Sequence, residues 1–421
     1  MATLSRLSIP TELIDKIVAE VITYGRRKDV TTCALLCKQW HEVTLRQTFR
    51  CVTFLLYKED GLIAFRQLIE RNTWLAPSIR SATLKFKRWS EGMKQNPGEF
   101  LMPVLDALST LAPQLQTLIF DDAHCRQGWV CRVLSRHLQP LRSVSTLKFR
   151  ICTLRMSDIK MFLRAMPNMQ HLDLSSSILS GDSKVGLSPA DVPALKSLRL
   201  SLSRVSRKEA SRKLLPAVVK LLTTSVAVRG ISCLSLDTPV SGRAEEGWSG
   251  VVGDLIRTLG PSLKYLRWYG DSWTDLETEF GVSTIDLTAN VHLHTLVLPS
   301  PTRTARNVAD SQLSRVLNTI IPGALRRIML CHSFVLETEF LHSYASLLSR
   351  PRFQSLTDIY FVQEDEWLAL IENRSIGQDE QNVQTAFAEF IARGVVVRVL
   401  EHDDGRVVAD RWEKETIVES D

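Results

Sequence analysis

Short apolar alternations recur along most of the chain. Segments such as Leu115–Phe120, Leu195–Leu200 and Leu293–Leu298 carry apolar residues at their first, fourth and sixth positions. This alternation puts the last two apolar side chains on one face of a short strand and the variable side chains on the other. The predicted strands are Ala82–Lys87, Leu115–Phe120, Val144–Phe149, Met169–Leu174, Leu195–Leu200, Ile231–Leu236, Leu263–Trp268, Leu293–Leu298, Leu325–Leu330, Leu356–Phe361 and, weakest, Val395–Leu400.

Helical patterns lie between these strands, with examples at 100–111, 156–166 and 312–321, and prolines such as Pro113 and Pro167 follow several of them. Proline stops a helix and sets the turn into the next strand. A strand and a helix repeated about every 30 residues predict an α/β repeat array. A doubly wound open sheet is the alternative. Its strands would be continuous apolar runs, whereas these are half polar.

The first 50 residues have a different pattern. Pro10 suits the first turn of a helix that carries Leu13, Ile14 and Ile17 on an apolar face. Two further short helices are predicted, one from Asp29 or Thr31 and one over about 38–48. Three helices in roughly 40 residues cannot bury a full core, so apolar surface is left for a partner or for the next domain. A helical cap on the following domain is the simpler interpretation.

The order of these residues resembles an F-box, in which Leu-Pro-x-Glu-Leu/Ile is followed by Ile and later by Leu-Val-Cys-x-x-Trp. Pro10, Glu12, Cys37 and Trp40 match, while Ile9 and Leu36 are mild replacements. Residues 49–54 resemble the segment that often follows the box in fungal F-box proteins. The repeats resemble leucine-rich repeats, and Cys152 occupies the Asn/Cys position of one of them. The resemblance therefore implies an F-box at 6–54, a leucine-rich-repeat solenoid at 55–400 and an acidic, flexible tail at 401–421.

By the same resemblance, the N-terminal helices would meet a Skp-type adaptor and, through it, a cullin. The residues implied in that contact are Pro10, Leu13, Ile14, Ile17, Leu35, Leu36, Cys37 and Trp40. Trp40 has an equal claim to a packing role, as a large aromatic residue. Cys33 and Cys37 are four residues apart, but no second pair of ligands lies nearby, so they are expected to be small buried hydrophobes.

The variable strand face is rich in cations in its first half. A basic face favours an acidic or phosphorylated target, which arginine can grip with two hydrogen bonds. A solvated strand face is the plainer alternative. The residues proposed to bind the target are Lys85, Lys87, Lys148, Arg150, Arg199, Arg267 and Tyr269.

Composition limits the cellular compartments and the classes of protein that fit this sequence. The chain has 421 residues, a net charge of +6 and eight scattered cysteines, which suit a reducing cytosol or nucleus. The last 21 residues hold eight acids and three bases, so their net charge is about −5. The sequence contains no apolar run of about 18 residues, so no membrane span is predicted. His292 and His294 lack a third ligand, so a surface pair is expected rather than a metal site.

No catalytic motif, metal site or cofactor site is recognisable in the sequence. The sequence thus predicts an α/β protein with a three-helix F-box and a curved repeat solenoid. Its predicted function is that of a non-catalytic substrate receptor of a Skp–cullin–F-box ubiquitin ligase. The alternative is a leucine-rich-repeat scaffold that binds protein or RNA without a ubiquitin ligase, its N-terminal helices serving as a cap.

Overall fold

The computed structural model describes most of the chain, with gaps. The residues described are 9–24, 27–56, 59–86, 97–122, 141–174, 178–180, 193–201, 230–237, 248–269, 285–299, 312–332, 338–363 and 376–419. The chain divides into two compact units, an N-terminal unit over Met1–Cys152 and a C-terminal unit over Thr153–Asp421. This division does not test the boundary predicted near residue 54, which stays a prediction.

The N-terminal unit begins with helices and continues with alternating strands and helices. Its elements are α1 (Thr11–Tyr24), α2 (Arg27–Leu35), α3 (Lys38–Thr48), β1 (Cys51–Leu55), α4 (Glu59–Arg71), the 3-10 helix η1 (Thr73–Ser78), β2 (Ser81–Lys85), α5 (Pro97–Leu111), β3 (Thr117–Asp121) and β4 (Thr146–Arg150). The three predicted N-terminal helices are thus present, and β1 and α4 were not predicted. α1 begins directly after Pro10, whose missing N–H is not needed at a helix start.

Helices α1 to α3 share a small core of their own. Ile14 and Val18 from α1 are buried against Cys33 and Val43, and Trp40 packs on this cluster. Two side-chain hydrogen bonds join α1 to α3: Gln39 Nε2 donates to Thr11 Oγ1 at 2.8 Å, and Gln47 Nε2 to Asp15 Oδ1 at 2.7 Å. Few large side chains are buried here, as expected for three short helices.

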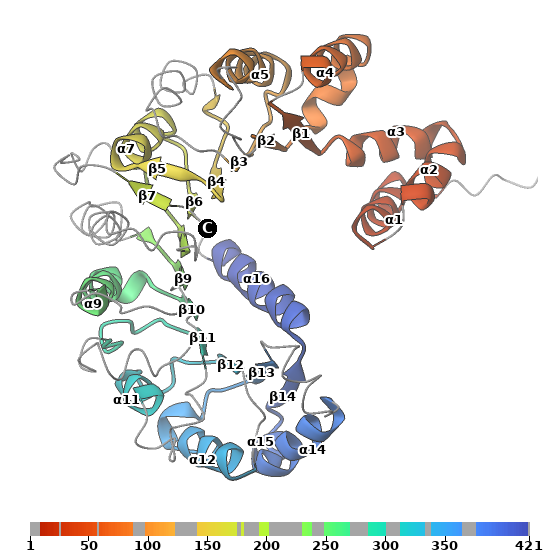
Figure 1. Cartoon of the computed structure of the whole chain (residues 1–421). Coiled ribbons are helices and arrows are strands. Elements are labelled where there is room, and N and C mark those ends of the chain that lie inside the picture. The colour runs from red at the N-terminus through yellow and green to blue at the C-terminus, as the bar shows by residue number, and fades with distance from the viewer. Residues whose placement is uncertain are drawn as a thin grey trace, which may run out of the picture. The chain divides into compact units, whose positions relative to one another are not determined.

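The C-terminal unit continues the alternation, as Figure 1 shows in yellow to blue. Its strands are β5 (Thr153–Arg155), β6 (His171–Leu174), β7 (Ile178–Ser180), β8 (Ser197–Ser201), β9 (Cys233–Asp237), β10 (Tyr265–Tyr269), β11 (Thr295–Pro299), β12 (Arg327–His332), β13 (Asp358–Gln363) and β14 (Val396–Leu400). Its helices are α7 (Met156–Ala165), α9 (Trp248–Leu259), η5 (Gly260–Ser262), α11 (Gln312–Thr319), α12 (Thr338–Leu348), η7 (Pro351–Phe353), α14 (Ile376–Ala386), α15 (Ala388–Ala392) and α16 (His402–Val418).

Within the described residues, twelve strands form one sheet in which the described pairs are all parallel, and β5 and β7 form a second, two-stranded one. Parallel neighbours need a crossover, and described helices lie in several of these connections, such as α5 between β2 and β3 and α12 between β12 and β13. The coarse prediction of an α/β protein with parallel strands alternating with helices is confirmed. All eleven predicted segments overlap a strand of the large sheet. The F-box and the leucine-rich repeat stay predictions.

The repeats are aligned residue by residue. Leu296 of β11 pairs with Ile328 of β12, which pairs with Ile359 of β13, so equivalent residues lie in rows across the sheet. In the first predicted segment Leu84 was taken as the equivalent of Leu118, but the residue that pairs with Leu118 is Ala82, so the prediction was two residues out of step.

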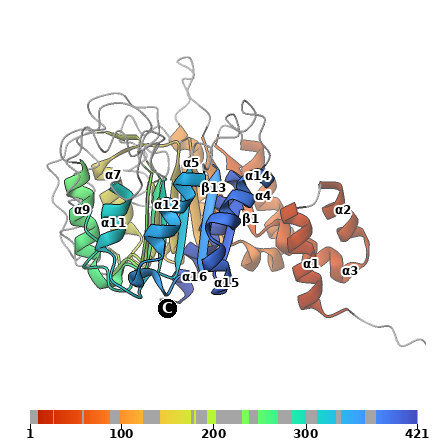
Figure 2. The ribbon, with the colours of Figure 1, turned by 90° about the horizontal axis from the view of Figure 1, so that it is seen from below.

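One face of the strands packs on the crossover helices where these are described. In the C-terminal unit, Phe361 of β13 contacts Tyr344 of α12 and Phe387, which lies between α14 and α15. Figure 2 shows α9, α11 and α12 side by side along this face. In the N-terminal unit the corresponding layer is a ladder in which Phe120 stacks on Phe149 with ring centroids 5.2 Å apart. We call this the helix face of the strands and the other the outward face.

Helix α16 lies on the outward face of the C-terminal unit, on the other side of the strands from α9, α11 and α12 (Figure 1). The sequence predicted a flexible acidic tail over 401–421. The structure instead has an ordered helix over His402–Val418 that packs on the sheet. Two of the acids taken as a sign of disorder, Asp410 and Glu415, have cationic partners on the strands, more than 80 residues earlier in the chain.

Candidate functional site: the strand face beneath the C-terminal helix

The outward face of β9 to β13 is apolar where α16 covers it. Each of these strands contributes one or two side chains to the apolar surface beneath α16, and all of them are almost fully buried. They are Cys233, Tyr265, Val297, Met329, Cys331 and Val362. Ala409 and Trp412 of α16 complete the cluster. The outward positions of these strands are therefore a buried surface and not a solvated one.

The first turn of α16 approaches the sheet very closely at Gly405. A Cβ added at this residue would overlap both methyl groups of Val362, with Cγ2 only 2.6 Å away. Val362 is fully buried and branched at Cβ, so its side chain has little freedom to move aside. Glycine is thus required for the helix to lie at this depth on β13.

Trp412 is the large apolar anchor of α16. Its ring stacks on Tyr360 with centroids 5.0 Å apart and planes inclined by 22°, and the Arg327 guanidinium carbon lies 5.7 Å from the ring centroid. Stacking and cation–π contacts each add to the free energy of burying an indole ring. Trp412 thereby fixes α16 above β12 and β13.

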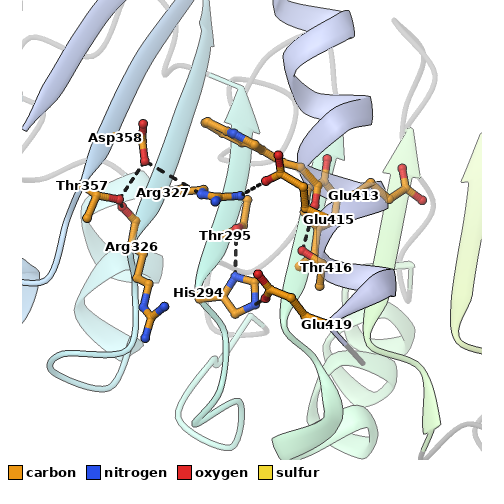
Figure 3. A network of polar contacts seen from close by, with 12 residues as sticks. His294, Thr295, Arg326, Arg327, Thr357, Asp358, Glu413, Glu415, Thr416 and Glu419 are labelled. Carbon is orange, nitrogen blue, oxygen red and sulfur yellow. Dashed lines mark hydrogen bonds and ion pairs between the residues drawn. The ribbon is translucent and has the colours of Figure 1, made fainter. Parts of the chain in front are cut away.

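Ion pairs surround this apolar contact. Arg327 Nη1 donates to Glu415 Oε2 at 2.6 Å, and its Nε lies 3.9 Å from Asp358 Oδ2 on the neighbouring strand, as Figure 3 shows. Arg267 Nη1 donates to Asp410 Oδ1 at 2.8 Å, and the Arg267 side chain is only 4% exposed. A guanidinium that is nearly buried needs such a charged partner, because desolvation without one is costly. The helix acids are therefore matched to strand cations.

His294 forms part of the same network near the end of α16 (Figure 3). Its ring Nδ1 lies 3.0 Å from Thr295 Oγ1, and its Nε2 lies 3.9 Å from Glu419 Oε2. Burial lowers the pKa of this imidazole below its ordinary value of 6.5, and the Glu419 carboxylate opposes that shift only in part. Lys264 Nζ donates to the Glu419 carbonyl oxygen at 3.4 Å.

Two further side chains fix the middle of α16. The Tyr265 hydroxyl donates to the Ala409 carbonyl oxygen at 3.2 Å, and burial raises the pKa of this phenol well above its usual range. Burial, with the Glu413 carboxylate nearby, raises the pKa of the Cys233 thiol to about 12. A neutral thiol at physiological pH is a poor nucleophile and metal ligand. Cys233 thus belongs to the packing of this face.

The structure separates the residues predicted to meet an adaptor into two groups. Ile14 is buried in the helical core, and Trp40 packs against it. The other six are exposed: Pro10, Leu13, Ile17, Leu35, Leu36 and Cys37. Leu35 is 79% exposed, Leu36 59% and Leu13 49%, which is unusual for leucine. Leu13 and Ile17 are one helical turn apart, so they share a face of α1.

The residues predicted to bind a target are also divided. Lys85 and Arg150 are exposed on the outward face of the N-terminal unit, and Lys148 is half-buried there. Lys85 Nζ lies 3.9 Å from Asp121 of the next strand. In the C-terminal unit Arg199 is half-buried and Arg267 lies beneath α16. Lys87 and the side chain of Tyr269 fall outside the described residues.

Sequence reasoning missed the helix side of the site altogether. Asp410, Trp412 and Glu415 lie in the segment interpreted as a tail, although a tryptophan among acids at helical spacing was a usable signal. Across the parts of the chain that the structure describes, no cluster of three metal-ligating side chains occurs. No helix in those parts is long and apolar enough to cross a membrane.

Comparisons with known proteins give no family for the chain. No family model matches it, and no curated protein matches it. Among solved structures, it is similar to the exo-beta-1,4-mannosidase Op5Man5 from Opitutaceae bacterium strain TAV5. The identity is 11% over 84% of this chain and 77% of that one, with a TM-score of 0.22.

These findings correct the function predicted from the sequence. Nothing in them identifies a ubiquitin-ligase receptor, and the solved structure named is that of an enzyme. The predicted role as a substrate receptor of a ubiquitin ligase and the prediction that the chain is not an enzyme are both wrong on this comparison. A TM-score of 0.22 is too low to carry the mannosidase activity, or its fold, over to this chain.

Proposed function

We propose that this chain is a protein-binding protein that docks a partner through the exposed apolar residues of α1 and α2. The observation that carries the proposal is the exposure of Leu35 and Leu36, at 79% and 59%, beside a helical core that buries few large side chains. Clustered exposed apolar side chains commonly mark interaction sites. Burying one leucine contributes about 1.5–3 kcal/mol, so two or three of them supply a useful share of a binding free energy.

The partner proposed is an adaptor protein of the Skp type, on the strength of the resemblance of residues 6–54 to an F-box. The large apolar side chains of that motif that are exposed, Leu13, Ile17, Leu35 and Leu36, are available for such a contact. Ubiquitin transfer forms no part of this proposal.

A pull-down of the full chain with a purified Skp-type adaptor tests the contact, using Leu35→Asp combined with Leu36→Asp. Two buried carboxylates at the interface should weaken binding at least tenfold, because each must be desolvated without a partner. Both positions are exposed, so the fold should persist, which circular dichroism checks. The matched control is Ile63→Asp on α4, an exposed apolar residue in the same unit that should leave binding unchanged.

Two outcomes count against the proposal. If the wild-type chain retains no adaptor at micromolar concentrations, the partner is wrong. If the double variant binds as tightly as the wild type, the contact does not run through the end of α2.

A further inference from the structure

The buried side of α16 has the spacing of a helix that is recognised by a groove. Its four most buried described positions follow one another at intervals of four, three and four residues: Gly405, Ala409, Trp412 and Thr416. Helices that bind a groove as separate ligands present anchors at this i, i+4, i+7 spacing. Only Trp412 among the four is large, so the helix has one main anchor.

The strand face beneath α16 complements this helix in charge as well as in shape. The face carries three cations. Arg267 lies on β10, Arg327 lies on β12, and Lys264 comes directly before β10. Their partners are Asp410, Glu415 and the backbone carbonyl of Glu419. The two acids, Asp410 and Glu415, lie five residues apart along the helix. The face therefore selects an acidic amphipathic helix.

The contact has the composition of a reversible interface. Arg327 and Glu415 keep 27% and 43% of their side chains exposed, and an ion pair of this kind contributes about 0–1 kcal/mol. Three of the four buried anchors are small and bury little apolar area. A short connection helps to hold α16 in place, since Glu401 alone separates it from β14 and gives it a high effective concentration.

We propose that the outward face of β9 to β13 is a docking surface for an acidic amphipathic helix of a partner protein, with α16 as its occupant within the chain. A partner helix with a tryptophan in place of Trp412 and acids in place of Asp410 and Glu415 binds the same face when α16 leaves it. This surface lies in the C-terminal unit and is independent of the docking proposed for α1 and α2.

The test uses the full chain with Gly405→Ala, which should lift the start of α16 from Val362. Hydrogen exchange over residues 402–418 should rise at least tenfold. A fluorescent synthetic peptide of residues 401–421 should then bind the variant at least ten times more tightly than it binds the wild-type chain, measured by anisotropy. The matched control is Gly61→Ala in α4, where an added Cβ meets no atom within 4 Å, and it should behave like the wild type.

A second variant, Asp410→Lys combined with Glu415→Lys, releases α16 through charge and not through a steric clash. It should also bind the wild-type peptide, and a peptide carrying the same two lysines should bind neither variant. Three outcomes overturn the proposal. The peptide fails to bind although α16 is released, or α16 stays protected in both variants, or both variants unfold beyond residues 402–418. The last two would make α16 a permanent part of the fold.

Discussion

The outward strand faces of the two units are built from the same repeat but have opposite character. In the C-terminal unit Tyr265, Val297 and Met329 occupy this face and are fully buried. In the N-terminal unit the corresponding row buries Ile119 of β3 but has the half-buried Thr83 and Lys148 on either side of it, and Arg150 is exposed. On the helix face both units bury leucine and phenylalanine alike. The residue types at the variable, outward positions therefore depend on what covers each part of the sheet. Those at the helix-face positions depend only on the fold.

The cations on the two outward faces also differ in their exposure to solvent. Lys85 is 53% exposed and lies 3.9 Å from Asp121, an arrangement in which solvent screens most of the attraction. Arg267 has a side chain 4% exposed and a 2.8 Å hydrogen bond to Asp410. A positive charge on an outward strand position is thus exposed to solvent at Lys85 and part of a packed interface at Arg267.

The largest effect expected from this contrast is that of Trp412→Ala. Removing a buried tryptophan costs about 3–5 kcal/mol in cores, and we expect a value at the lower end for Trp412, which keeps 5% of its surface exposed. Urea denaturation should show a loss of about 3 kcal/mol for this variant. Lys148→Ala in the N-terminal unit should change stability by less than about 0.5 kcal/mol. Equal effects from the two variants would remove the distinction between the faces.

An intermediate effect is expected from the acids that partner the two cations. Asp410→Ala leaves the buried Arg267 guanidinium without this carboxylate and should cost about 1–2 kcal/mol, below the value for a fully buried pair because Asp410 is half exposed. Asp121→Ala, beside the exposed Lys85, should be nearly neutral. Thermal unfolding of both variants measures this difference. Adding Arg267→Met to Asp410→Ala should recover part of the loss, and no recovery would argue against burial of the charge as its cause.

The smallest expected effect is a pH dependence confined to the covered face. Burial lowers the pKa of His294 in the folded chain, so below the ordinary pKa of 6.5 the unfolded chain binds the proton more readily. The folded state is therefore most stable above pH 6.5 and loses stability as the pH falls below it. The melting temperature of the wild type should drop further between pH 7.5 and 5.5 than that of His294→Gln. His292→Gln, at an exposed position two residues earlier, should follow the wild type.

Much of the fold could be predicted because its signal is local. Each strand shows its own alternation, and the helix-face residues Leu118 and Leu147 pair as their matching positions suggest. β1 was missed, because the outward and helix-face positions of Cys51–Leu55 show no clear alternation of polar and apolar residues. The first strand was placed out of step because Leu84 and Phe86 fit the apolar alternation as well as Ala82 and Leu84 do. Only the pairing with β3, of Ala82 with Leu118 and of Leu84 with Phe120, decides between the two registers.

The candidate site was less predictable because its two halves are far apart in the sequence. Arg267 and Asp410 are separated by 143 residues. Neither residue, taken alone in the sequence, indicates that the other is its partner. The buried positions of α16 also do not form a recognisable apolar pattern, because Gly405, Ala409 and Thr416 are small or polar. Sequence patterns detect large buried side chains better than close approach of a backbone, and this helix depends on close approach.

Gly405 has a consequence for how sequence variation in this chain should be interpreted. A scan of all substitutions would find this position intolerant, because every other side chain begins with the Cβ that Val362 excludes. Such intolerance is often taken as a sign of catalysis or ligand contact, yet Gly405 has no side chain to offer to either. Here it would measure how strongly the organism requires the strand face to be covered. A tolerant position 405 would show that cells can use the chain with that face open.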